Sequence, residues 1–101
     1  MGLSLSKKTE SIDKLRKRIE RVTLEIFDLC GERFQLAKQI GEIKAHEGIP
    51  VENAEIEQKL RARVMEQCKK NNLDEKFGLK LLHLLLEESK QVQRDAIKTQ
   101  C

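Results

Sequence analysis

The sequence is poor in aromatic residues and in proline. It has three phenylalanines, no tryptophan, no tyrosine and a single proline among 101 residues. Charged residues, in contrast, make up 37% of the chain. This balance suits helices with large solvated surfaces better than a β-sandwich or barrel, so it favours an all-α fold. The length is enough for one domain.

The sequence also lacks the signatures of several binding classes. Its net charge of +3 is small and spread along the chain, and no aromatic residues are placed for base stacking, so we expect no nucleic-acid partner. No apolar run approaches the roughly 18 residues of a membrane span. The cysteines Cys30, Cys68 and Cys101 show no metal-ligand spacing, so we expect no metal. We expect reduced thiols and a cytoplasmic protein.

One long amphipathic pattern dominates the first half of the chain. Its positions alternate in steps of three and four, as in a heptad repeat, and all but one are apolar. We call this set the apolar seam, and it consists of Ile12, Leu15, Ile19, Val22, Ile26, Leu29, Arg33, Leu36, Ile40 and Ile43. The seam predicts a helix over about residues 11–47, preceded by a flexible segment, 1–10. Gly48 and Pro50 end that helix.

Two shorter helices are predicted after the turn. Asn53 is a good N-cap for a helix over about 54–71, and Asp74 caps a third helix over about 75–99. Residues 81–86 are apolar nearly all round, which predicts deep burial. Residues 11–99 would form one helical domain.

The length of the first helix indicates a second chain. At 1.5 Å per residue it would extend about 55 Å, whereas a compact chain of this size is only about 33 Å across. Because the seam is apolar along its whole length, a two-fold partner is the simplest cover. We therefore predict an intertwined six-helix homodimer.

Four polar residues interrupt apolar helical faces. Arg33 occupies a seam position, and a guanidinium buried there needs an anionic partner. That partner would be a bound ligand or a carboxylate of the protein, unless the side chain extends to solvent at the edge of the helix. Lys44 follows three helical turns later on the same face, about 16 Å away, or it simply marks the fraying edge of the seam. Ser89 and Gln93 stand one turn apart on one helical stripe. They indicate a small polar pocket, or a helix emerging into solvent.

These residues, in this order and spacing, resemble the all-helical (AroQ-class) chorismate mutases. The resemblance runs without a gap from about Ile12 to Gln93. It is carried by Leu15-Arg16-Lys17-Arg18-Ile19, Glu32-Arg33-Phe34-Gln35-Leu36-Ala37, Ile43-Lys44, Gly48-Ile49-Pro50-Val51, Glu57, and Glu87-Glu88-Ser89-Lys90-Gln91-Val92-Gln93. It implies three helices per chain in an intertwined dimer. It also implies the Claisen rearrangement of chorismate to prephenate, a step towards phenylalanine and tyrosine, without a cofactor.

The resemblance also implies a role for each polar residue. Arg33 and Arg16 would grip the two substrate carboxylates, with Ser89 assisting. Lys44 and Gln93 would bond the ether oxygen of the breaking C–O bond. Glu57 would accept a hydrogen bond from the ring hydroxyl; taken alone, it is an ordinary first-turn carboxylate. Taken alone, Arg16 is a surface residue.

The two arginines cannot act on one ligand from the same helix. They are seventeen residues apart, about 25 Å along the axis and about 100° around it. If both bind substrate, Arg16 comes from the partner chain.

Two positions depart from the family pattern. Ile56 stands where many relatives have arginine, and Asn53 where aspartate is common; both would line the pocket. The departures admit a sister activity, loss of pyruvate from isochorismate, while a non-catalytic helical interaction protein is the alternative from another class. The Arg33→Leu variant distinguishes an enzyme from an interaction protein. Its stability should be kept or raised in either case, but an enzyme would also lose its activity.

Overall fold

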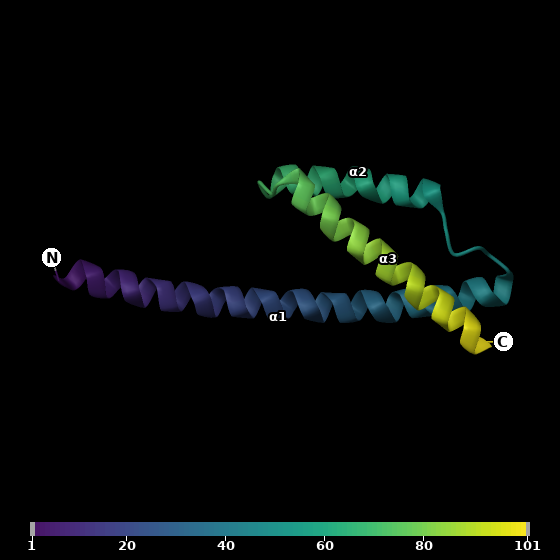
Figure 1. Ribbon diagram of the computed structural model, residues 1–101, viewed down its shortest axis with the longest axis horizontal. Helices are drawn as coiled ribbons and strands as arrows, with labels where there is room; N and C mark the ends of the chain where they lie inside the picture. Colours follow the sequence, from purple (N-terminus) through teal and green to yellow (C-terminus); the bar gives the residue numbers. More distant parts are fainter. Residues whose placement is uncertain (1, 101) are drawn as a thin grey trace. The chain divides into compact units, whose positions relative to one another are not determined.

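The computed structural model describes residues 2–100, so Met1 and Cys101 lie outside the described residues. It contains three helices, α1 (Gly2–Glu47), α2 (Ala54–Lys70) and α3 (Glu75–Gln100), and no strand between residues 2 and 100 (Figure 1). The predicted all-α fold with one long and two shorter helices is therefore confirmed. Within the same range, every helix is too short or too polar to span a membrane.

The first helix starts earlier than the apolar spacing predicts. α1 begins at Gly2 rather than near Ser11, because a polar sequence can be helical without an apolar stripe to reveal it. A helical backbone does not show how much a segment moves. The flexibility of residues 1–10 therefore stays a prediction.

The chain divides into two compact units, Met1–Arg33 and Phe34–Cys101. The first unit is the N-terminal part of α1. Its seam side chains are between 46% and 65% exposed: Ile12, Leu15, Ile19, Val22, Ile26 and Leu29. A single helix has no core of its own, so this stripe stays open within the unit.

The helix ends of the second unit follow from local capping. The Asn53 side chain accepts a hydrogen bond from the Ile56 backbone N–H at 3.1 Å and caps α2. Gly48, with φ of 69°, ends α1, and the N–H of Ile49 then closes onto the carbonyl of Lys44 at 2.9 Å. This is the left-handed C-terminal motif in which glycine is favoured.

The turn before α3 uses the same physics. Asn72 adopts φ of 54°, a left-handed conformation that asparagine tolerates better than most residues. The N–H of Leu73 bonds the carbonyl of Cys68 at 2.9 Å. The Asp74 carboxylate then accepts from the Phe77 N–H at 3.3 Å and caps the new helix.

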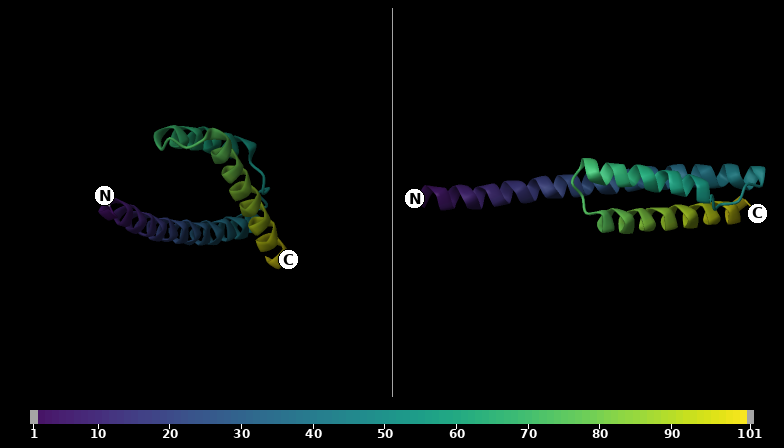
Figure 2. Two further views of the ribbon diagram at one scale, coloured as in Figure 1. Left: turned by 60° about the vertical axis from the view of Figure 1, so that its left-hand side comes forward. Right: turned by 90° about the horizontal axis from the view of Figure 1, so that it is seen from above.

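Helix α3 packs on α2 near its start and on the last part of α1, residues 34–47, near its end (Figures 1 and 2). Small residues allow both approaches. A Cβ at Gly78 would overlap the sulfur of Cys68 on α2. At the other contact, a Cβ at Gly41 would lie 2.8 Å from the Cα of Gln93.

The buried face of α3 is narrower than the composition of this helix predicts. Leu82 is buried, but Leu81 and Leu84 are 41% and 67% exposed, so the expected deep burial of residues 81–86 is wrong for the single chain. The physical reason is that α2 covers one face of this stretch, whereas its leucines point in nearly every direction.

Candidate active site

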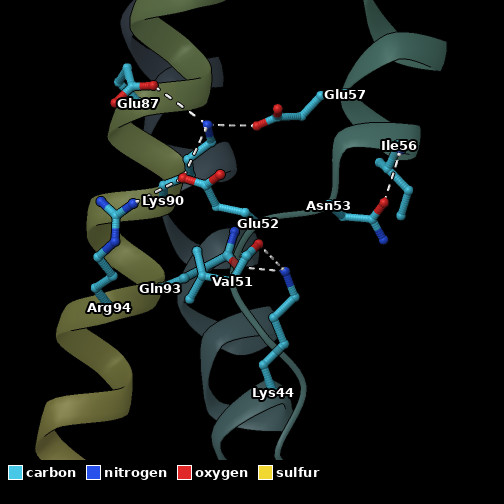
Figure 3. A network of polar contacts seen from close by, with 10 residues as sticks. All are labelled: Lys44, Val51, Glu52, Asn53, Ile56, Glu57, Glu87, Lys90, Gln93 and Arg94. Atoms are coloured by element: carbon cyan, nitrogen blue, oxygen red, sulfur yellow. Dashed lines mark hydrogen bonds and ion pairs between the residues drawn. The ribbon is translucent and has the colours of Figure 1, made fainter.

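Polar side chains from α1, α2, α3 and the segment between α1 and α2 form a cluster, which we call the polar cluster: Lys44, Glu52, Glu57, Glu87, Lys90, Gln93 and Arg94. Its centre is a contact between α1 and α3. The Lys44 ammonium donates hydrogen bonds to the Gln93 side-chain oxygen at 2.8 Å and to the Val51 carbonyl at 2.8 Å. Figure 3 shows Lys44 reaching up from α1 to both acceptors. Gln93 is buried, with 8% of its surface exposed. One cation thus ties α1, the connecting segment and α3 together.

This contact fixes the orientation of the Gln93 amide. Because the amide oxygen accepts from Lys44, the amide nitrogen is left as a donor. The ammonium has three N–H donors, of which these two bonds use two. Beyond this contact, Lys44 and Gln93 each have a further N–H donor, and two neighbouring donors can stabilise negative charge on an oxygen.

The close approach at Gly41 holds Gln93 in place. A Cβ there would also lie 2.9 Å from the Gln93 carbonyl oxygen and 3.0 Å from the Ala96 Cβ. We expect Gly41→Ala to lower the free energy of unfolding by about 1–2 kcal/mol, since overpacking costs more than the gain in helix propensity. Displacing Gln93 should also lower kcat for the reaction proposed below by about tenfold. Urea unfolding and steady-state kinetics measure both effects.

Gly31→Ala is the matched control. A Cβ at Gly31 meets no atom within 4 Å, and the position faces away from the apolar seam, two residues from both Leu29 and Arg33. The same substitution should here stabilise α1 by up to about 1 kcal/mol. Equal stabilisation by both substitutions would contradict the close packing at Gly41.

A second polar contact joins α2 to α3 through Lys90. Its ammonium lies 2.8 Å from the Glu57 carboxylate, 3.5 Å from Glu87 and 3.9 Å from Glu52. Arg94 also contacts Glu52, at 3.5 Å. Figure 3 shows Lys90 pointing from α3 towards Glu57 on α2, with Glu52 between the two helices.

Lys90 is the less exposed partner in this contact. Its side chain is 14% exposed, against 26% for Glu57. The hydrogen bond to Glu57 raises the pKa of Lys90, and the charges of Glu57, Glu52 and Glu87 add to this effect, which exceeds the opposing effect of burial. Lys90 therefore remains an ammonium ion.

The remaining predicted site residues fall in both units. Ser89 is half-buried on α3, one turn before Gln93, and Ile56 is 61% exposed at the start of α2. Asn53 is the N-cap of α2, a task that asparagine performs as well as aspartate. Arg16 is exposed and Arg33 half-buried, both in the first unit.

Comparison with known proteins identifies the family. The family model described as chorismate mutase type II matches residues 15–94. The chain belongs to the type II chorismate mutase family. A chorismate mutase from Methanocaldococcus jannaschii is 35% identical over 89 residues, which are 88% of this chain and 90% of that protein. A bifunctional chorismate mutase/prephenate dehydratase from Aquifex aeolicus is 39% identical over 56 residues, 55% of this chain and 16% of that protein.

The family predicted from the order of the polar residues is thereby confirmed. Membership of the type II chorismate mutases also confirms the prediction of an isomerase over that of a helical interaction protein.

The sequence of this member of the chorismate mutase family did not predict three residues of the polar cluster, Glu52, Lys90 and Arg94. A signal existed for Lys90. It follows Leu86 by four residues and precedes Gln93 by three, so it belongs to the stripe that faces the polar cluster. That signal is weak, because charged residues make up 37% of the chain and a lysine in such a sequence is most often solvated.

Proposed function

We propose that this chain catalyses the rearrangement of chorismate to prephenate, in the cytoplasm, at sites that each use residues of two chains. The observation that carries the proposal is the Lys44–Gln93 contact at 2.8 Å, within a family of chorismate mutases. The relative from Aquifex aeolicus carries both chorismate mutase and prephenate dehydratase in its name, which supports a place in aromatic amino-acid biosynthesis.

The reaction requires no covalent bond between the protein and the substrate. A pericyclic rearrangement needs no nucleophile or base, and it is accelerated by holding the flexible substrate in its compact conformer. As the C–O bond breaks, negative charge grows on the ether oxygen. Fixed donors aimed at that oxygen lower the barrier, and the N–H groups of Lys44 and Gln93 are donors of this kind.

The other predicted residues would bind the rest of the substrate. Arg33 and the Arg16 of a partner chain would each pair with a carboxylate, in the bidentate geometry that guanidinium groups favour. Ser89 would assist at a carboxylate, and Glu57 would accept from the ring hydroxyl. Asn53 and Ile56 would line the pocket.

Two observations support an assembly of two chains. The seam side chains of the first unit are about half exposed or more, and a contiguous apolar stripe of this length is typical of an interface. Arg16 and Arg33 are also about 25 Å apart along one helix, too far to hold one small molecule. A homodimer covers the stripe and supplies the second arginine.

Chorismate consumption with identification of the product tests the activity. The purified chain should consume chorismate far above the background rate and yield prephenate. Incubation with isochorismate should yield no salicylate or pyruvate. A rate equal to background with chorismate would refute the proposal, and release of pyruvate from isochorismate would assign the sister activity instead.

A further inference from the structure

Three carboxylates surround the ammonium group of Lys90. Glu57 on α2, Glu52 in the connecting segment and Glu87 on α3 all lie within 4 Å of one ammonium group, that of Lys90. Arg94 contacts Glu52 at 3.5 Å from a more exposed position. The charge of Glu57 is therefore balanced directly by Lys90.

The negative charge of these carboxylates conflicts with the charge of the proposed substrate. Chorismate carries two carboxylates, so an uncompensated Glu57 would repel it. At an effective dielectric constant near 20, a unit charge about 10 Å away changes binding by roughly tenfold or more. A cation bound to the Glu57 carboxylate removes this repulsion.

We propose that Lys90 is a positioning residue, which fixes Glu57 against α3 and cancels its charge so that the pocket accepts a dianion. This inference rests on the proposed function. Lys90 acts through Glu57, at 2.8 Å, and is not assigned a contact with the substrate.

The positions of the contact residues support this role. Glu57 follows Asn53, the cap of α2, by four residues, so the ion pair sets the first turn of α2 relative to α3. Lys90 precedes Gln93 by three residues on α3, and Gln93 meets Lys44 at 2.8 Å. The two polar contacts are thus about one helical turn apart on α3, so we expect the charge of Glu57, without Lys90, to weaken the binding of a dianion at Lys44 and Gln93.

Kinetics of Lys90→Met separate the two roles. We expect KM for chorismate to rise about tenfold, from repulsion by the uncompensated carboxylate, while kcat changes less than about threefold. Lys90→Arg retains the cation and should restore KM to within about threefold of the wild type. Lys80→Met removes an exposed lysine from the same helix and should leave both constants unchanged.

A double-variant cycle tests whether Lys90 works through Glu57. In a Glu57→Gln background the closest carboxylate is gone, and the carboxylates left near Lys90, Glu87 at 3.5 Å and Glu52 at 3.9 Å, are both more than half exposed. Solvent screens their charges, so adding Lys90→Met should raise KM by less than about twofold. An equal tenfold rise in both backgrounds would overturn the proposal, as would wild-type kinetics in Lys90→Met. If Lys90→Met fails to fold by circular dichroism, the KM of Lys90→Gln decides the question by the same criteria.

The wild-type assay separates this inference from the proposed function. A wild-type chain without chorismate mutase activity would overturn both. An active wild type with an unchanged Lys90→Met variant would overturn only the role of Lys90.

Discussion

Replacing Lys44 by methionine should lower kcat for chorismate rearrangement by about a hundredfold or more, the usual effect of removing one donor from a preorganised transition-state site. Methionine keeps an unbranched side chain of similar length but removes every N–H donor. The buried Gln93 oxygen and the Val51 carbonyl both lose their 2.8 Å bonds. The free energy of unfolding should therefore fall by about 1–3 kcal/mol, and kinetics should be measured well below the midpoint of thermal unfolding.

Lys38→Met is the control for that experiment. Lys38 lies on the same helix but is exposed, so removing its charge should leave kcat and stability close to wild type. Loss of only a fewfold in kcat for Lys44→Met, at a temperature where the variant is folded, would mean that Lys44 does not stabilise the ether oxygen.

The fold was predictable because its signals are local. The apolar seam, the caps at Asn53 and Asp74 and the glycine at Gly48 each act over a few residues, and the structure uses all three capping groups. The start of α1 was not predictable, since no apolar residue spacing marks it. The exposure of Leu84 was also missed, because composition does not say which face of a helix another element covers.

The contact at the centre of the candidate site was predictable because both of its residues break an apolar pattern. Lys44 and Gln93 stand out for that reason, and they meet in the structure. The pairing of Lys90 with Glu57 was not predictable, because both are charged residues at positions that suit solvent and the contact depends on how α2 crosses α3. Arg16 stands out least, and its assignment depends on the resemblance and on a partner chain.

Mixing two inactive variants tests most directly whether the site is shared between two chains. Arg16→Ala and Arg33→Ala should each lower kcat/KM by about a hundredfold or more, since each removes a charged partner of a substrate carboxylate. In a mixed dimer, the intact Arg33 of one chain meets the intact Arg16 of the other. Random pairing gives mixed dimers in about half of the population with one intact site of two, so activity should recover to about a quarter of wild type.

The measurement is chorismate consumption after the two variants are unfolded together in urea and refolded. Each variant refolded alone is the control, and it should stay inactive. Recovery to about a quarter of wild-type activity is the result that the shared site predicts. A mixture that stays as inactive as its separate components, although it forms dimers, would contradict it.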